Sequence, residues 1–419
     1  MIKQITFQNW KSYRETTLYI DPLTILIGTN ASGKSNALDG LEFLRRASLG
    51  KEIRPSLAGD QAIEAIRGGT DWAAFHGENQ FKISTLVEGN DNTTDFQHSI
   101  TIETPLSSDG GAQAQLEAED LVRIKYRGKN KASSSKVSLF WTEPSAPQEP
   151  SIQARLYNGK AGVKQSLHRS RSILSQLKGL PIRQEIQDGV DRVSDSLRNI
   201  FIFNPIPSRM RTFSQLSDEI NTDASNIAGV LAALEKRDAA NVEATLAEYI
   251  TQLPERDIKR VWAEKVGRFA SDAMLYCEEK WTENSPSTTI DSRSMSDGTL
   301  RFIAIVTALL TRPTGSLMVI EEIDNGLHPS RSHLLLRMLR EIGAKRKIDI
   351  LATTHNPALL DALTPDLVPF VTVAHRDNRT GESKLTLLEE VKDLPKLLAS
   401  GPIGFLSTKG AIERSLANI

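Results

Sequence analysis

The residues that could do chemistry form four short segments near the two ends of the chain. Residues 28–35 read Gly-Thr-Asn-Ala-Ser-Gly-Lys-Ser and directly follow an apolar run at 23–27. This G-x-x-x-x-G-K-S pattern between a strand and a helix is typical of loops whose backbone N–H groups surround phosphate oxygens. The alternative is a glycine turn that joins the two elements by chance. The amphipathic helix expected next, with Leu38, Leu41 and Leu44, argues against it.

Each polar group of this loop has an expected role. Lys34 should reach the β- and γ-phosphates of a nucleotide, and the Ser35 hydroxyl should ligate Mg²⁺. The helix that begins near Lys34 adds the partial positive charge of its N-terminus. The residues predicted to bind the nucleotide here are Gly28, Asn30, Ala31, Ser32, Gly33, Lys34, Ser35 and Asn36.

The second segment places two acids after a short apolar run. Residues 317–320 read Leu-Met-Val-Ile, the form expected of a strand buried on both faces, and Glu321 and Glu322 follow. Carboxylates at such a position are costly to bury unless a metal or hydrogen-bond donors pair with them. We therefore assign Glu321 to the Mg²⁺ shell, through water, and Glu322 as the general base or orienter of an attacking water. The alternative is the start of a solvated loop.

The remaining two segments are weaker when taken alone. Residues 349–355 read as another buried strand, ending in His355, which could bond a terminal phosphate, although a lone histidine is more often structural. Ser296 is placed to cap the apolar helix expected at 302–310, and a helix N-terminus is an anion site. By itself, this last segment indicates only a capped helix.

These segments need a framework, and the pattern of the chain predicts an α/β fold for it. Alternating residues indicate antiparallel strands, and from about residue 165 apolar residues recur at helical spacing. The strands are expected at 81–87, 98–103, 121–126, 137–141 and 152–157. The expected domains are an N-terminal lobe with the phosphate loop at 1–100, an antiparallel β extension of that lobe at 101–160, a helical insertion at 161–290 and a C-terminal lobe at 291–419.

Composition narrows the class of protein. The chain has 419 residues, a formal net charge of -1 and one cysteine, Cys277. A charge near zero gives no overall attraction to nucleic acid, so any contact with DNA must come from local patches. A single cysteine excludes an intramolecular disulfide and suits a reducing compartment. No signal-peptide pattern and no apolar run of roughly 18 residues is visible, so we expect a cytoplasmic protein with no membrane contact.

Together, these residues resemble the ABC-type ATPase heads of the RecF/SMC/OLD group. Residues 2–12 are similar to that group's first strand and its asparagine–aromatic–basic–serine turn. Residues 296–298 resemble the signature motif, with Asp297 where many members have glycine. Residues 321–329 resemble the acidic strand and D-loop of the OLD-like branch, with Glu321 where most heads have aspartate.

The resemblance implies an ABC-type P-loop ATPase head with a mixed sheet, an antiparallel β meander and a helical insertion. It implies ATP and Mg²⁺ as cofactors, with Lys34, Glu322 and His355 as the catalytic residues. Two heads would pair head to tail, and each ATP would be held by the phosphate loop of one head and by Ser296 and Gly298 of the other. ATP would then switch the state of assembly.

Three functions stay open. The first is an ATP-gated oligomeric switch in prokaryotic anti-phage defence. The tail after His355 is expected to be too short for the Toprim domain of OLD nucleases, so a nuclease effector would be a separate protein. The second is a RecF/SMC-like ATPase of DNA repair or maintenance that binds DNA through the basic clusters at 123–131, 168–171 and 209–211. The third, an ATPase subunit of a transporter, is disfavoured by the opening strand and the acidic motif.

Overall fold

The computed structural model describes residues 1–104, 113–128, 133–146, 149–253, 258–280, 286–392 and 394–416. The chain forms two compact units, each built from separate stretches of sequence. The first unit contains Met1–Asp21, Ile27–Ile200 and Thr372–Leu387, and the second contains Pro22–Leu26, Phe201–Val371 and Leu388–Ile419. The phosphate loop therefore belongs to the first unit, whereas the two acids, the histidine and the signature segment belong to the second.

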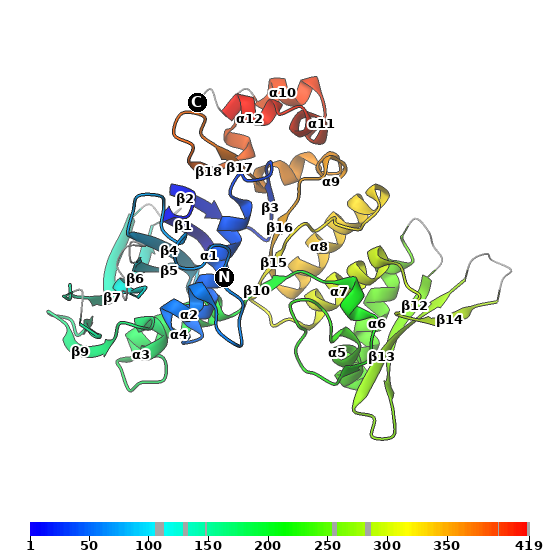
Figure 1. Cartoon of the computed structure of the whole chain (residues 1–419), viewed down its shortest axis with the longest axis horizontal. Helices are drawn as coiled ribbons and strands as arrows, with labels where there is room; N and C mark the ends of the chain where they lie inside the picture. Colours follow the sequence, from blue (N-terminus) through cyan, green and yellow to red (C-terminus); the bar gives the residue numbers. More distant parts are fainter. Residues whose placement is uncertain are drawn as a thin grey trace. The chain divides into compact units, whose positions relative to one another are not determined.

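The first unit is built around an eight-stranded antiparallel sheet in the order β2-β1-β4-β5-β6-β7-β8-β9 (Figure 1). Buried and more exposed residues alternate along its strands, as in β4, where Phe81, Ile83 and Val87 are buried. The strands predicted in the middle of the chain are confirmed, and β2 and β9 add to them. The bounds are β1 (Ile2–Trp10), β2 (Tyr13–Tyr19), β4 (Gln80–Glu88), β5 (Thr94–Glu103), β6 (Gln115–Arg127), β7 (Ser133–Thr142), β8 (Ser151–Leu156) and β9 (Val163–His168).

Helices pack against this sheet. In α4 the buried residues Ile186, Val190, Val193 and Leu197 recur every three or four positions, and this stripe faces strands β4 to β7. The same unit contains the antiparallel pair β17 (Val371–Arg376) and β18 (Ser383–Leu387), of which Val371 alone belongs to the second unit. The helices are α1 (Lys34–Ser48), α2 (Ile53–Ala58), α3 (Ile173–Leu177) and α4 (Gln184–Arg198).

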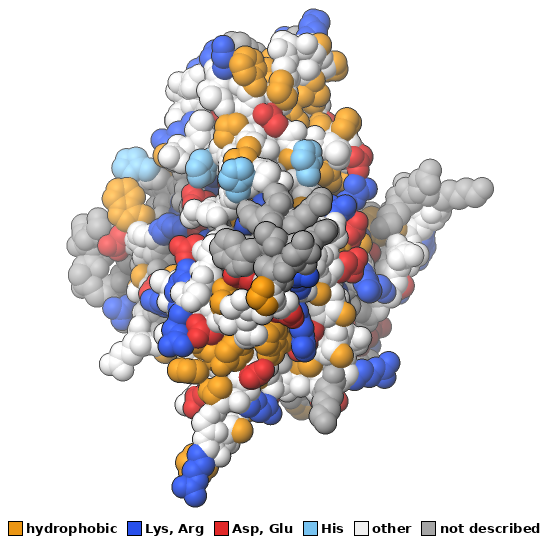
Figure 2. Space-filling model, turned by 90° about the vertical axis from the view of Figure 1, so that its right-hand side faces the viewer, with side chains coloured by type: hydrophobic (Ala, Val, Ile, Leu, Met, Phe, Trp, Pro, Cys, Tyr) orange, Lys and Arg blue, Asp and Glu red, His pale blue; other side chains and the backbone are white. Residues whose placement is uncertain are grey.

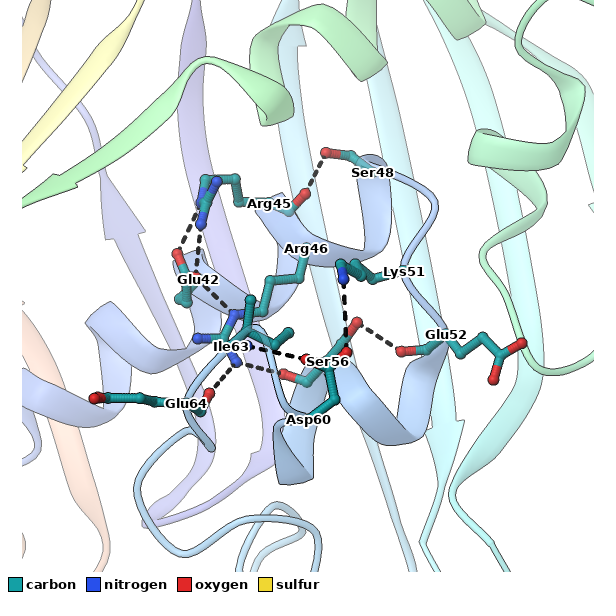
Figure 3. Close-up of polar contacts among 10 residues, drawn as sticks. All are labelled: Glu42, Arg45, Arg46, Ser48, Lys51, Glu52, Ser56, Asp60, Ile63 and Glu64. Atoms are coloured by element: carbon teal, nitrogen blue, oxygen red, sulfur yellow. Dashed lines mark hydrogen bonds and ion pairs between the residues drawn. The ribbon is translucent and has the colours of Figure 1, made fainter. Parts of the chain in front are cut away.

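The second half of α1 is fixed by a buried arginine (Figure 3). The Arg46 guanidinium donates to Glu42 Oε1 at 2.6 Å and to the carbonyl oxygens of Ser56 and Glu64 at 3.2 and 2.8 Å. Arg45 donates to both oxygens of the same Glu42 carboxylate, and this pairing lowers the pKa of Glu42 against the effect of its burial. The helix that follows the phosphate loop is thus attached to α2 and to the loop after it.

The second unit contains strands that are hydrogen-bonded in the order β10-β15-β16-β3. Strands β15 (Leu317–Ile320), β16 (Asp349–Thr353) and β3 (Leu23–Ile27) run parallel, and every residue in them is buried. The carboxyl ends of parallel neighbours meet at one edge of a sheet. That edge carries the residues after β15 and β16, which include both acids and the histidine. The other elements here are β10 (Ile200–Phe203), α7 (Asp297–Thr311), α8 (Ser332–Arg346) and α9 (Pro357–Asp361).

The segment 161–290 contains the expected helices and also an antiparallel sheet that the pattern did not predict. Strands β12 and β13 form a long antiparallel pair, and α5 and α6 pack on it (Figure 1). Residues 273–275 are all buried, so β13 lacks the alternation that would have revealed it. The elements are β11 (Ser214–Gln215), α5 (Ile227–Ala233), α6 (Lys236–Ile250), β12 (Ile258–Val266), β13 (Asp272–Glu279) and β14 (Thr288–Asp291).

Three short helices complete the second unit after β18. They are α10 (Leu394–Ser400), α11 (Ile403–Thr408) and α12 (Ala411–Leu416). Helix α11 lies close to α9, and the Gly404 amide of α11 donates to Asp361 Oδ1 of α9 at 2.7 Å. Across the described ranges, no helix combines the length and the apolar character needed to cross a membrane.

A buried carboxylate organises the start of α3 in the first unit. The Glu119 side chain has an exposed fraction of 0% and lies 2.8 Å from His98 Nε2. It accepts bonds from the Ser172 hydroxyl at 2.7 Å and from the amides of Ile173 and Leu174 at 2.6 and 3.1 Å. The carboxylate thus satisfies two of the amides that a helix start leaves unpaired. One carboxylate of β6 thus holds a segment more than fifty residues further along the chain.

We predict that Glu119→Ala destabilises the protein, because it removes the acceptor for two amides and a hydroxyl that stay buried. The free energy of unfolding should fall by about 3 kcal/mol. Urea denaturation followed by circular dichroism measures it. Glu15→Ala, which removes an exposed carboxylate from β2, is the control and should change stability by less than about 0.5 kcal/mol. Equal effects of the two substitutions would contradict the prediction.

Candidate nucleotide-binding site

The phosphate loop, residues 28–35, connects β3 to α1 in a conformation that few residues could adopt. Gly28 has φ +144°, and a Cβ there would lie 2.2 Å from the carbonyl oxygen of Ala374. Helix α1 begins at Lys34, as predicted. Arg376 Nε donates to the carbonyl oxygen of Ala31 at 3.0 Å. The loop backbone is therefore held from within its own unit.

Two side chains of the loop indicate what it can hold. Lys34 Nζ donates to the carbonyl oxygens of Gly28 and Thr29 at 2.6 and 2.9 Å, which places the ammonium over the loop. Ser32 Oγ is buried and has no hydrogen-bond partner among the residues that the structure describes. A buried hydroxyl without a partner is costly, and a phosphate oxygen would accept its hydrogen bond. The loop therefore fits a phosphate group.

The turn between β1 and β2 fastens the loop and the first turn of α1. Tyr13 donates from its hydroxyl to the Gly33 carbonyl at 2.7 Å, and burial raises the pKa of Tyr13, so the hydroxyl keeps its proton. Trp10 Nε1 donates to the Asn36 carbonyl at 2.7 Å. Asn36, predicted to bind the nucleotide, directs its amide to Ser12 Oγ at 2.7 Å. Asn36 thus links the turn to the helix.

The basic residue of that turn is already paired. Lys11 is only 6% exposed, and its Nζ contacts Asp39 Oδ2 at 2.5 Å and the carbonyl oxygen of Arg67 at 2.7 Å. Burial lowers the pKa of Lys11, and the Asp39 carboxylate opposes this fall. The ammonium is therefore neutralised inside the first unit and joins the turn to α1 and to the loop around residue 67.

In the second unit, the structure brings together the predicted base and the predicted histidine. The nearest nitrogen and oxygen, His355 Nδ1 and Glu322 Oε1, are 3.7 Å apart, and both side chains are about half exposed, at 56% and 48%. Thr354, next to the histidine, donates to Asp324 Oδ1 at 2.6 Å. The segments after β15 and β16 thus form one cluster, here called the acid–histidine cluster, made of Glu321, Glu322, Asp324, Thr354 and His355.

The backbone at Glu322 is unusual. Its φ is +48°, a value uncommon for residues other than glycine. Its amide donates to Thr353 Oγ1 at 2.9 Å. Arg301, one turn into α7, donates to the carbonyl oxygens of Glu321 and Glu322 at 3.1 and 3.0 Å. The conformation is therefore fixed by partners on two other elements.

Ser296 caps α7, as predicted, and accepts a bond from the Thr299 amide at 3.1 Å. Arg211 reinforces this start of the helix. Its guanidinium donates to the carbonyl oxygens of Ser292, Arg293 and Met295 at 2.7 to 3.0 Å, and to Asp297 Oδ1 at 2.5 Å. The aspartate at the second position of the signature segment thus has a basic partner in the same unit.

Gly298 is required by packing. A Cβ there would lie 2.6 Å from the carbonyl oxygen of Gly326 and 3.0 Å from a guanidinium nitrogen of Arg331. Gly326 belongs to the turn after the acids, the segment that resembles a D-loop. The signature segment and this turn therefore touch within one unit.

The predicted residues thus lie in two groups. Those of the phosphate loop are in the first unit, whereas Ser296, Gly298, Glu321, Glu322 and His355 are in the second. Sequence reasoning missed Arg211, Arg301 and Thr353, which position the latter group. One signal was available: Arg301 is a charged residue at the start of a strongly apolar helix, and such a residue needs a buried partner.

A parallel strand that leads into a phosphate loop, a second buried strand that ends in two acids, and a capped signature helix are the parts of an ABC-type P-loop ATPase head. The chain belongs to the family described as "AAA domain, putative AbiEii toxin, Type IV TA system", whose model matches residues 23–361. This confirms the expected class of ATPase at the level of the family.

Curated relatives are similar over a limited stretch. The chromosome partition proteins Smc of Mycolicibacterium paratuberculosis and Mycobacterium tuberculosis are each 27% identical over 118 residues, which is 27% of this chain and 9% of the relative. The SMC head domain from Thermotoga maritima covers 92% of this chain and 98% of its own, with 13% identity and a TM-score of 0.41. The SmcHead bound to the C-winged helix domain of ScpA covers 92% and 97%, with 14% identity and a TM-score of 0.49.

We predict that Arg211→Met loosens the signature segment, because four hydrogen bonds to it are lost while the Ser296 cap stays. Amide hydrogen exchange across residues 293–299 should accelerate about tenfold or more. The matched control is Arg209→Met, which removes an exposed arginine from the same turn and should leave these amides unchanged. Unchanged exchange in Arg211→Met would mean that the cap alone holds the segment.

Proposed function

We propose that this protein binds and hydrolyses ATP with the help of Mg²⁺. The observation that carries the proposal is the phosphate loop, in which the Lys34 ammonium lies over the loop carbonyls and the buried Ser32 hydroxyl lacks a protein partner among the described residues. The match to an AAA-domain family supports it. The half-exposed Glu322 carboxylate, close to His355, is open to a water molecule.

Each residue has a stated part in the proposed reaction. Lys34 binds the β- and γ-phosphates and stabilises the charge that develops on them. Glu322 orients the attacking water and accepts its proton, and His355 bonds the terminal phosphate and reports its loss. Ser35 and Glu321 would hold Mg²⁺, Glu321 through water, and the ion would neutralise phosphate charge.

We further propose that ATP joins two copies head to tail. Ser296 and Asp297 are exposed at the start of α7, so the signature segment is accessible to a second copy. In this arrangement Ser296 and Gly298 of one copy contact the ATP bound by the phosphate loop of the other, which gives a two-fold interface. ATP binding would close the pair and hydrolysis would release it.

We propose, as the biological role, the sensor and ATPase component of a prokaryotic anti-phage defence system. The family description, which names a toxin of a toxin–antitoxin system, supports a role in such conflicts. The protein would be OLD-like, would act in the cytoplasm and would control a separate effector, such as a nuclease.

The alternative is a RecF/SMC-like ATPase that binds DNA directly, which the partial similarity to Smc favours. Lys125 and Arg127 are exposed on β6, whereas Arg123 is mostly covered and lies 3.7 Å from Glu185; Lys129 and Lys131 lie outside the described residues. On the face drawn in Figure 2, basic and acidic side chains are interspersed among the described residues. Any contact with DNA would therefore be local.

We predict that Glu322→Gln binds Mg-ATP but hydrolyses it at least about 100-fold more slowly. The trapped nucleotide should raise the molar mass measured by light scattering, or keep a preformed oligomer intact on dilution. Lys34→Ala should bind no nucleotide, and Glu389→Gln, which changes an exposed carboxylate elsewhere, should behave as the wild type. Normal turnover by Glu322→Gln would refute the base assignment, and ATP binding without any change of mass would refute the head-to-tail pair.

The two roles are separated by DNA affinity. For the defence role we expect Lys125→Glu/Arg127→Glu to keep ATPase activity and to leave weak duplex binding unchanged. Fluorescence anisotropy with a labelled duplex of about 30 base pairs at several salt concentrations measures binding. Lys265→Glu/Arg268→Glu, on the β12–β13 hairpin, is the charge-matched control. Strong, salt-sensitive binding that only the β6 variant loses would favour the DNA-maintenance role.

A further inference from the structure

Arg301 is a buried cation in an otherwise apolar stretch of α7. Its exposed fraction is 5%, and the residues from Gly298 to Leu309 around it are all buried. The guanidinium donates to the carbonyl oxygens of Pro205, Glu321 and Glu322 at 3.3, 3.1 and 3.0 Å. Burying a charge is costly, and a methionine could fill the same space. Arg301 Nη1 donates to Pro205, and Nη2 donates to both Glu321 and Glu322, so the buried cation supplies donors to two separate segments.

Arg301 bonds both of the peptide groups that flank the Cα atom of Glu322. In the first, the Glu321 carbonyl accepts from Arg301 and the Glu322 amide donates to Thr353 Oγ1 at 2.9 Å. In the second, the Glu322 carbonyl accepts from Arg301 and the Ile323 amide donates to the Thr353 carbonyl at 3.1 Å. Each peptide group is thus held at both ends, by Arg301 on one side and by Thr353 on the other.

Two fixed peptide groups determine the direction of the Cα–Cβ bond between them. With φ at +48°, Glu322 adopts a conformation that residues with a side chain visit rarely and that persists only where neighbours impose it. If Arg301 were absent, both carbonyls would lose their donor, each peptide group would be held by Thr353 alone, and the backbone could relax. The Glu322 carboxylate would then point elsewhere.

Charge supports the same arrangement. Burial lowers the pKa of Arg301, and the carboxylates of Asp324 and Glu322 oppose this fall. The positive charge is therefore matched by acids of the same acid–histidine cluster.

We propose that Arg301 is a positioning residue for ATP hydrolysis: it fixes the two peptide groups around Glu322 and so directs the carboxylate toward the attacking water. The proposal rests on the function proposed above, with Glu322 as the base. Arg301 touches neither ATP nor water in this scheme, and it acts only through the backbone of Glu322.

The experiment compares Arg301→Met and Arg301→Lys with the wild type in steady-state ATPase assays. Arg301→Met should lower kcat by about 100-fold, while KM and the affinity for a fluorescent ATP analogue change less than about twofold. Arg301→Lys keeps the charge but has one donor nitrogen in place of two, on a shorter and more flexible chain, and should recover about tenfold of that loss. The matched control is Arg312→Met, because Arg312 is a buried arginine at the other end of α7; it should keep the wild-type kcat.

A double variant separates positioning from general packing. Since Arg301 acts through Glu322, Arg301→Met/Glu322→Gln should be no slower than Glu322→Gln alone. In the absence of nucleotide, the amides of Glu322 and Ile323 should exchange faster in Arg301→Met than in the wild type. If Arg301→Met does not fold, Arg301→Lys provides both readouts.

Two results would overturn the proposal. One is a further loss of rate in the double variant, and the other is a loss of ATP affinity in Arg301→Met as large as its loss of kcat. A folded wild type without ATPase activity would have a different meaning: the proposed function itself fails, and the role of Arg301 in hydrolysis fails with it.

Discussion

The end of a buried strand sets the main physical constraint on the second unit. The regular pairing of β15 with β16 ends at Ile320 and Ala352, so the peptide groups that follow β15 need hydrogen-bond partners outside that pairing. Thr353 and Arg301 supply them instead. This requirement explains why α7 carries a cation next to the sheet and why β16 ends in threonine.

The first unit meets a comparable constraint at the phosphate loop. A loop that turns its amides toward an anion directs its carbonyl oxygens away from that anion. These oxygens then need hydrogen-bond donors from other parts of the protein. Tyr13 and Arg376 bond two of these carbonyls, and Lys34 bonds two more. The turn between β1 and β2 is therefore part of the structural support of the loop.

Sequence reasoning succeeded where the signal was local. The phosphate loop, the Ser296 cap, the buried strands around β15 and β16 and the strands of the meander all follow from short patterns. It missed what depends on distant partners. The hairpin of β12 and β13 has a continuous apolar stretch rather than alternation, and Arg301 bonds backbone carbonyls that leave no side-chain pattern to recognise. The separation of 53 positions between Glu119 and Ser172 hid their contact in the same way.

The close approach of Gly298 to Gly326 changes how a signature glycine should be weighed as evidence. Such a glycine is usually taken as a mark of nucleotide contact, yet here any larger residue would collide with the chain's own backbone. Selection for a folded protein would therefore preserve it even in a descendant that had lost its enzymatic activity. In genome surveys, the presence of this glycine is therefore no evidence by itself that a chain contacts a nucleotide.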